Sequence, residues 1–264
     1  MKPFALHRLP LWITLTACAL LIAHGPVAQL DRYHDFADRS VVAGILHAAD
    51  VASNLGFALV ALWGLVVLHP QRRHPALRAG WPGYLLFLSG LLLTAAGSSF
   101  YHLAPDNARL VWDRLPIALA CAGLLAAVRS ETIPGVNGMR GTAWLALFAV
   151  FSVGWWRYTD LQGVGDLRPY LLIQGLPIIL IPLWQAIHRA PRADRAGFGF
   201  ALLLYVLAKF AELNDHSLLL ALGWISGHTL KHLLATCAAA LLVGRLVRRA
   251  DAPAAAARPE VVVV

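Results

Sequence analysis

Three histidines in this chain could hold one metal ion. His228 and His232 are four residues apart, so on a helix they lie on one face, a single turn from each other. His102, much earlier in the chain, supplies a third nitrogen ligand if the fold brings the two stretches together. Three histidines and an open coordination position form a catalytic zinc site, in which the metal activates water.

The elements that must position these histidines are membrane helices. The chain has 264 residues, of which 59% are hydrophobic and only 14% are charged, whereas soluble domains are nearer a quarter charged. The net charge of +8 comes from basic residues in short loops. Basic residues at such positions orient a protein in a bilayer, so the charge does not indicate a nucleic-acid partner. The three cysteines show no paired spacing, so neither a disulfide framework nor a thiolate metal site is predicted.

Eight apolar runs approach the roughly 20 residues that a helix needs to cross a bilayer. The sequence therefore predicts an all-α fold, a polytopic transmembrane helix bundle without a second soluble domain. The first run resembles a signal peptide, but its cleavage signature is poor, so we interpret residues 1–29 as an uncleaved anchor. Residues 249–264 are expected to form a disordered cytoplasmic tail. The predicted spans are 10–28, 50–68, 81–101, 113–128, 142–156, 169–187, 198–214 and 224–244.

The positions of Lys and Arg predict the orientation of the bundle. With a cytoplasmic N-terminus, 14 of the 22 basic residues fall in inside segments and six in outside loops, so both termini are predicted to be cytoplasmic. Ser98 and His102 then lie at the outer end of the third span, one turn apart. Asp113 begins the fourth span outside, and His228 and His232 occupy the first two turns of the eighth. All five residues therefore converge on one leaflet.

Structural roles are the alternative for these polar residues. The histidine pair alone also fits a role in which the two side chains hydrogen-bond neighbouring helices. Lys209, Glu212 and Asp215, at the end of the seventh span, form a further charged set. Lys209 and Glu212 are three residues apart and can pair inside the bundle, so we interpret the set as structural or supporting rather than catalytic.

The combined motif resembles that of the alkaline ceramidases. It consists of Ser98-x-x-x-His102, then Asp113, then His228-x-x-x-His232 near the C-terminus. The family belongs to a superfamily of seven-helix membrane hydrolases that includes the adiponectin-type receptors, and the resemblance covers residues 33–246. It implies a seven-helix ceramidase-like core, here within residues 30–248, with the span at 10–28 as an addition.

The resemblance also implies an activity. The matching histidines of the family hold zinc, which implies His102, His228 and His232 as ligands of Zn²⁺ in this chain. The matching serine and aspartate lie beside the metal-bound water. This implies that Asp113 accepts the water proton and that Ser98 donates to the developing oxyanion. We therefore expect a zinc-dependent hydrolase, an amidase that cleaves ceramide-like N-acyl sphingoid lipids to a free fatty acid and an amine base.

Two other functions are consistent with the same residues. One is a receptor-like, non-catalytic member of the superfamily, with a structural zinc and a bound membrane lipid. The other is a transporter, which fits less well because the polar residues cluster at one end of the bundle. A content rich in Ala, Leu and Arg is typical of a bacterial inner (plasma) membrane protein, here with its site toward the outer face. Because many bacteria make little ceramide, the substrate could also be another amide-linked or ester-linked lipid.

A calcium site is a further expectation from the resemblance. Animal members of the family bind calcium through acidic residues just before their first core helix. Asp35, Asp38 and Asp50 lie in the corresponding region, but they do not match that site ligand for ligand. The expectation of a Ca²⁺ site therefore rests only on the place of these acidic residues in the chain. The sequence leaves the oligomeric state open.

Overall fold

Long helices make up most of the structure. The computed structural model describes residues 6–251, and within them six helices are long and apolar enough to cross a membrane. The predicted helical bundle is thus confirmed, and the length and composition of these helices are consistent with an integral membrane protein. The six are α3 with α4 (Ala48–Ser53 and Leu55–Leu68), α5 (Trp81–Leu103), α6 (Asn107–Thr132), α8 (Arg168–Ile187), α9 (Arg192–Leu213) and α11 (Gly227–Asp251).

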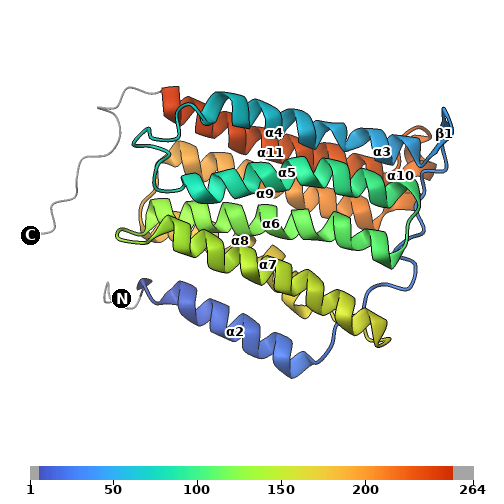
Figure 1. Cartoon of the computed structure of the whole chain (residues 1–264), viewed down its shortest axis with the longest axis horizontal. Helices are drawn as coiled ribbons and strands as arrows, with labels where there is room; N and C mark the ends of the chain where they lie inside the picture. The colour runs from blue at the N-terminus through green and yellow to red at the C-terminus, as the bar shows by residue number, and fades with distance from the viewer. Residues whose placement is uncertain (1–5, 252–264) are drawn as a thin grey trace, which may run out of the picture.

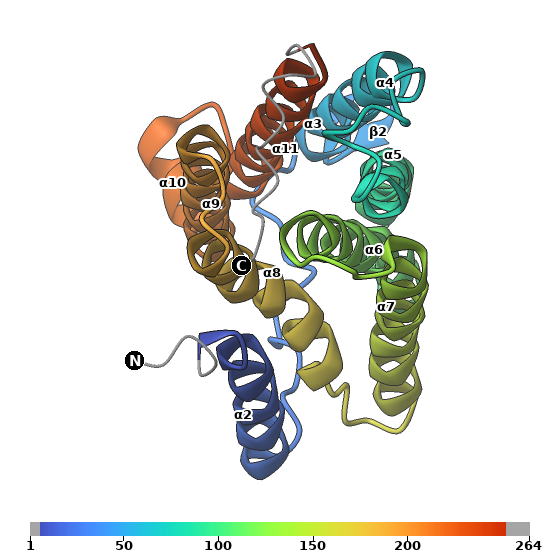
Figure 2. The same cartoon turned by 90° about the vertical axis from the view of Figure 1, so that its left-hand side faces the viewer.

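The long helices run side by side along the longest axis of the molecule (Figure 1). Seen along that axis, α4, α5, α6, α8, α9 and α11 form a ring (Figure 2). Helix α7 (Gly138–Leu161) packs against α6 and α8, and α2 (Leu9–His24) lies at the edge of the bundle against α8. The ring places α5, α6 and α11, which carry the five predicted site residues, around one interior.

Two of the eight predicted spans are helices outside this set of six. Helix α2 has only 16 residues, because Gly25 adopts a left-handed φ of 83° and Pro26 follows it. The helix therefore ends at His24, a few residues before the approximate predicted end at 28. Helix α7 has 24 residues, but Arg140, Arg157 and Asp160 near its ends make it less apolar than the other long helices. The count of seven core spans and one added span stays a prediction.

The C-terminal boundary of the bundle also differs from the expectation. Helix α11 continues to Asp251, so residues 249–251 are helical and do not belong to a tail. The remainder of the predicted tail, 252–264, and the start of the predicted anchor, 1–5, lie outside the described residues.

Polar contacts hold α2 to the bundle. The backbone N–H of Val27 donates to the Asp166 carboxylate at 3.2 Å, and the Arg168 guanidinium donates to the Leu21 carbonyl at 3.3 Å. Asp166 and Arg168 form a salt bridge of 2.9 Å. Burial raises the pKa of Asp166, but hydrogen bonds from Arg168 and Trp155 outweigh it and lower this pKa to about 2. The carboxylate that anchors α2 therefore stays ionised at neutral pH.

Glycine allows α5 and α6 to approach each other closely. Three glycines recur every seven residues of α5, and a Cβ on any of them would overlap backbone atoms of α6. The tightest place is Gly97, where an added Cβ would lie 1.9 Å from the carbonyl oxygen of Trp112. Small residues permit such approach between membrane helices. Here the contact brings together Ser98 and Asp113, the residues that follow Gly97 and Trp112 in the two helices. The glycines are Gly83, Gly90 and Gly97.

Two short elements at the end of the bundle where α5 ends and α11 begins were not predicted (Figure 1). A hairpin pairs β1 (Val41–Val42) with β2 (Ile45–Leu46). Its turn contains Ala43 and Gly44, both at positive φ. Helix α10 (Asp215–Leu222) follows α9 and ends at Gly223. These elements lie where α5 ends and α11 begins, so they are positioned to support the site.

Candidate metal centre

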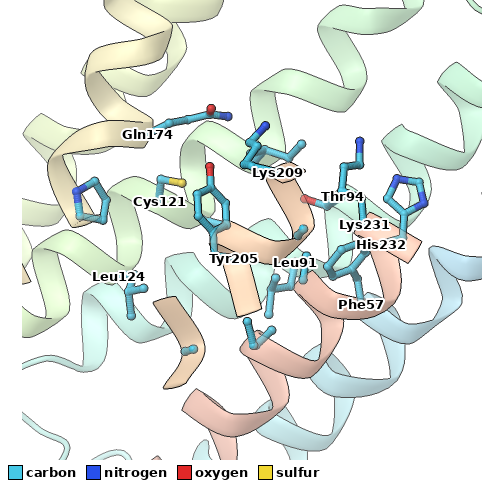
Figure 3. Close-up of a pocket in the computed structure, with 18 of the residues that line it drawn as sticks. Phe57, Leu91, Thr94, Cys121, Leu124, Gln174, Tyr205, Lys209, Lys231 and His232 are labelled. Atoms are coloured by element: carbon cyan, nitrogen blue, oxygen red, sulfur yellow. The ribbon is translucent and has the colours of Figure 1, made fainter. Parts of the chain in front are cut away.

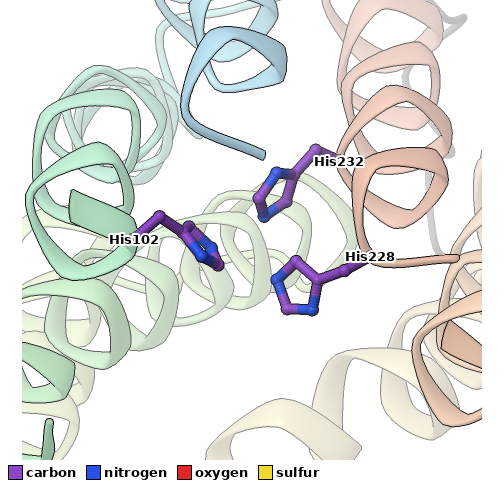
Figure 4. A group of neighbouring side chains, drawn as sticks. All are labelled: His102, His228 and His232. Atoms are coloured by element: carbon purple, nitrogen blue, oxygen red, sulfur yellow. The ribbon is translucent and has the colours of Figure 1, made fainter. Parts of the chain in front are cut away.

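The three predicted histidines meet at one end of the bundle (Figure 4). His102 comes from the last turn of α5, and His228 and His232 come from the first two turns of α11. One ring nitrogen of each lies within 4.8 Å of the others, and all three side chains are buried. In the part of the chain that the structure describes, this is the one group of three or more ligating side chains that could hold a metal ion. A metal-capable centre is thus confirmed, and zinc as its metal stays a prediction.

The hydrogen bonding of two of these rings fits metal binding. The Ser53 hydroxyl donates to the carbonyl oxygen of Asp50 at 2.9 Å, so it accepts from Nδ1 of His232, which is 2.8 Å away. With the proton on Nδ1, the lone pair on Nε2 is free to bind a metal. The buried Nδ1 of His102 has no hydrogen-bond partner within residues 6–251. Because an unpaired buried nitrogen is costly, this ring also fits the role of a ligand.

Polar contacts from other elements position the backbone around the histidines. Nδ1 of His47 lies 2.9 Å from the carbonyl oxygen of His102. The Asp215 carboxylate accepts from the backbone N–H of His228 at 2.7 Å and from that of Ala37 at 2.8 Å. Asp215 thus joins α10, α11 and the loop before the hairpin, in agreement with the supporting role predicted for it. A lone histidine such as His47 had given no comparable signal in the sequence.

Asp38 and Asp50 make contacts within the fold. Asp50 is fully buried, and one of its carboxylate oxygens accepts from the Thr229 hydroxyl at 2.5 Å. Asp38 accepts from two backbone N–H groups at the start of α3, at 3.0 and 3.1 Å. Burial raises the pKa of Asp38, but hydrogen bonds from Ser40 and the α3 backbone outweigh it and leave it below its usual value. Among the described residues, no group of three or more metal-ligating side chains includes Asp35, Asp38 or Asp50, so the Ca²⁺ expectation gains no support.

Ser98 and Asp113 lie beside each other, as the close contact of α5 with α6 requires. Their hydroxyl and carboxyl groups interact, and both side chains are buried. Both also line a cavity that reaches Lys231 and His232. The fold therefore brings together the five residues that were predicted from three separate stretches of sequence.

The residue after Asp113 corrects the predicted topology. Arg114 is one of the six basic residues counted in outside loops from the sequence, but it lies within α6 and is only 2% exposed. Its guanidinium lies 4.1 Å from the ring centroid of Trp156, 4.9 Å from that of Tyr33 and 5.3 Å from that of Tyr170. Aromatic faces stabilise a desolvated cation. Arg114 is thus a buried structural cation and gives no information on orientation.

The cavity has a volume of about 230 Å³, and Lys231 lies beside His232 in its lining (Figure 3). Four charged residues line the cavity. They are Asp113, Lys209, Glu212 and Lys231. Apolar side chains extend the lining away from the histidines, as far as Phe198 and Leu202 of α9 and Leu242 of α11. Phe198 and Glu212 are 14 positions apart on α9, which corresponds to ~21 Å along the helix axis. The cavity is therefore long, apolar along most of its length and charged at the metal centre.

Glu212 links α9 to α11 at the charged end of the cavity. It accepts from the Lys209 ammonium at 2.8 Å and from the Lys231 ammonium at 2.9 Å. Lys231 also lies 2.8 Å from Nε2 of His228. The predicted pairing of Lys209 with Glu212 is confirmed. Lys231 was missed, although its position between two predicted ligands on a membrane helix was a usable signal.

Comparison of the chain with protein-family models, with curated proteins and with solved structures finds no match. The resemblance to the alkaline ceramidases therefore rests on the motif, and its functional meaning is a proposal.

Proposed function

We propose that the protein is a zinc-dependent amidase that acts on a lipid within the membrane, as its resemblance to the alkaline ceramidases implies. The observation that carries this proposal is that His232, one of the three grouped histidines, lines the charged end of a long apolar cavity together with Ser98 and Asp113. A ceramide-like N-acyl sphingoid lipid is likewise polar at one end, where its amide lies, and apolar along its hydrocarbon chains. Hydrolysis would release a free fatty acid and an amine base.

His102, His228 and His232 would hold the zinc ion. When bound, zinc lowers the pKa of a coordinated water to about 7 and polarises the substrate carbonyl. The Asp113 carboxylate is suited to accept a proton from the attacking water and to return it to the leaving amine. The Ser98 hydroxyl is suited to donate to the oxyanion that develops on the amide carbonyl. These roles assign each predicted site residue a function in amide hydrolysis.

The apolar part of the cavity would hold an acyl chain. Its lining comes from α4, α5, α6, α8, α9 and α11, and includes Phe87, Leu91 and Leu124. Because the lipid tails of the bilayer are as apolar as these side chains, the cavity would select an acyl chain by its length and fit, and not by removing it from water. The same side chains exclude water from the reacting amide, which strengthens the interactions of Asp113 and Ser98.

The proposal includes a membrane topology. Helix α7 would supply the seventh core span, and α2 would be an added anchor against α8. Without Arg114, the outside segments hold five of the basic residues counted above and the inside segments 14. This bias again predicts that both termini are cytoplasmic. The charged end of the cavity then faces the outer side of a bacterial inner membrane, at the level of the lipid headgroups.

The experiment that tests the function measures the zinc content of the purified protein together with release of fatty acid from an N-acyl sphingoid lipid. We expect about one zinc per chain, as a three-histidine site binds one ion. His228→Ala should lose both the metal and the activity. Asp113→Asn, which preserves side-chain size, should keep the metal and lose at least roughly 10²-fold in rate.

The two possible failures point to different conclusions. Stoichiometric zinc without cleavage of any acylated lipid would overturn the enzyme assignment and favour the receptor-like alternative. Absence of zinc from a correctly folded protein would overturn the metal centre itself.

A further inference from the structure

The chain uses lysine at very few positions. It contains 19 arginines and three lysines, and two of the lysines, Lys209 and Lys231, line the cavity. The third, Lys2, lies outside the described residues. Arginine therefore supplies the basic charge of all the described loops, whereas the compact ammonium group occurs only at the cavity. Such a group is a strongly hydrated point charge that suits a phosphate or a carboxylate.

One carboxylate serves both lysines. Each ammonium is within 2.9 Å of a different oxygen of Glu212. Figure 3 shows Lys209 and Lys231 near each other at the end of the cavity where His232 lies. Either lysine alone would neutralise Glu212, so the second positive charge is not needed for the ion pair. A charge inside a membrane bundle is costly, and it usually has a functional role.

A metal ion at the histidines would add positive charge to the charged end of the cavity. The carboxylates of Asp50 and Asp215 lie behind the histidines, on Thr229 and on the backbone of His228, and do not line the cavity. Lys209 and Lys231 contribute two positive charges, and Glu212 and Asp113 contribute two negative charges, so these side chains sum to zero. A divalent ion held by three neutral histidines adds two positive charges. A neutral amide lipid offsets none of this charge. An anion on the lipid headgroup would offset one or two of these positive charges in a region of low dielectric constant.

Lys209 has hydrogen-bond donors to spare. An ammonium has three donors. Among the described residues, Lys231 donates to Glu212 and to His228, whereas Lys209 donates to Glu212 and lies 6.0 Å from the ring centroid of Tyr205. The Lys209 side chain is 44% exposed, against 17% for that of Lys231. Lys209 is therefore the better placed of the two to contact a ligand in the cavity.

We propose that this end of the cavity recognises an anionic group, a phosphate or a carboxylate, on the headgroup of the lipid. Lys209 makes the main contact and Lys231 adds its charge. The inference deepens the proposed function and rests on it. The preferred substrate is an amide-linked lipid with an anionic headgroup, in preference to a neutral or a cationic one.

Binding of ligands that cannot be hydrolysed tests the anion site apart from catalysis. The full-length protein, with and without zinc, is titrated with dodecyl phosphate, dodecanoate, dodecanol and dodecyltrimethylammonium. The zinc-free sample shows binding to the lysines without direct coordination of the anion to the metal. We expect at least one anionic probe to bind roughly tenfold or more tightly than dodecanol in both samples, the effect of one charge-assisted contact. The cationic probe should bind more weakly than dodecanol.

Substitution of Lys209 tests the assignment to this residue. Lys209→Met leaves the Lys231–Glu212 pair intact, and it should reduce the preference for the anionic probe over dodecanol by roughly tenfold. Lys209→Arg keeps the charge and should retain most of the preference. Arg195→Met removes an exposed cation from the opposite end of α9 and should leave the preference unchanged. Equal affinity for anionic and neutral probes in the wild type, or an unchanged preference in Lys209→Met, would overturn the proposal.

Hydrolysis assays distinguish the two kinds of anion and separate this inference from the proposed function. The substrates are an N-acyl lipid with a phosphate headgroup, one with a carboxylate headgroup and a neutral ceramide. A higher kcat/KM for one anionic lipid supports the inference and identifies the anion. Equal kcat/KM for all three lipids would overturn the inference and leave the amidase assignment intact. Cleavage of none of them would overturn the amidase assignment, and with it this choice of substrate.

Discussion

The Ser53 hydroxyl lies 2.8 Å from Nδ1 of His232, although the two residues are 179 positions apart in the chain. Through this contact α3 supports a ligand on α11 and keeps the ring proton away from the metal-binding nitrogen. Loss of a residue that orients a metal ligand typically weakens metal binding by 10–100-fold. We predict an effect of roughly this size on zinc affinity in Ser53→Ala.

Competition with a chelator in detergent solution measures the effect of Ser53→Ala. Ser53→Thr retains a hydroxyl and is the matched control, with an affinity expected to stay close to that of the wild type. If Ser53→Ala bound zinc as tightly as the wild type, the serine would not be what fixes the tautomer of His232.

The ligands could be predicted from the sequence because their geometry is mostly local. His228 and His232 share a helix face through their spacing, and Ser98 and His102 share another. Only the meeting of the two stretches needed a topology, and the basic residues gave one. That topology predicted the convergence of all five residues although it misplaced Arg114, because one misassigned charge left the bias unchanged.

The supporting contacts could not be predicted because they join residues that are distant in sequence or lie in irregular segments. The contact of Asp215 with His228 depends on the short helix α10, whose 8 residues are too few to be recognised as a membrane span. The early end of α2 depends on a single glycine at positive φ, which a count of apolar residues does not detect. Hydropathy identifies a membrane helix, but it does not identify the polar partners of that helix.

Asp215 should be important for the stability of the metal end of the bundle. Its carboxylate is the acceptor for backbone N–H groups of His228 and Ala37. Asp215→Ala leaves both donors without this acceptor, at a cost of about 1–3 kcal/mol for each donor that stays buried and unpaired. We predict a lower midpoint of thermal unfolding in detergent, together with weaker zinc binding. Asp215→Asn retains one acceptor oxygen and should lose less. Equal midpoints for wild type and Asp215→Ala would contradict this role.

Gly97 should tolerate no side chain. A Cβ at this position would lie 1.9 Å from the Trp112 carbonyl oxygen, which is backbone and cannot move without its helix. Gly97→Ala should therefore separate α5 from α6 and destabilise the protein by at least about 1–3 kcal/mol, as overpacking does. Because Ser98 and Asp113 flank this contact, hydrolytic activity should fall as well.

A second glycine provides the control for Gly97→Ala. Gly154 lies within α7, and a Cβ added there would meet no atom within 4 Å. Gly154→Ala should be neutral or stabilising, because alanine favours a helix over glycine by about 1 kcal/mol. Thermal unfolding of the two variants in the same detergent compares them directly. A Gly97→Ala protein as stable as Gly154→Ala would contradict the close approach of α5 and α6.

The attachment of α2 should depend on pH through Asp166. Its pKa is lowered from the usual 3.8 to about 2, with the effect of burial outweighed by the hydrogen bonds from Arg168 and Trp155. A group whose pKa is lower in the folded protein contributes stability above its unfolded pKa and loses it as the pH falls through the folded pKa. The contribution of Asp166, about 2 kcal/mol at 1.36 kcal/mol per pKa unit, is therefore complete above about pH 4 and lost toward about pH 2.

Limited proteolysis between pH 5 and pH 2, with an acid-active protease, would follow this change at the connection after α2. Cleavage near Val27 should increase as the pH falls below 4 in the wild type, because a protonated Asp166 binds Arg168 and the Val27 N–H less strongly. Asp166→Asn cannot ionise, so its cleavage should be faster at pH 5 and should depend less on pH. An equally steep pH dependence in Asp166→Asn would assign the effect to other carboxylates.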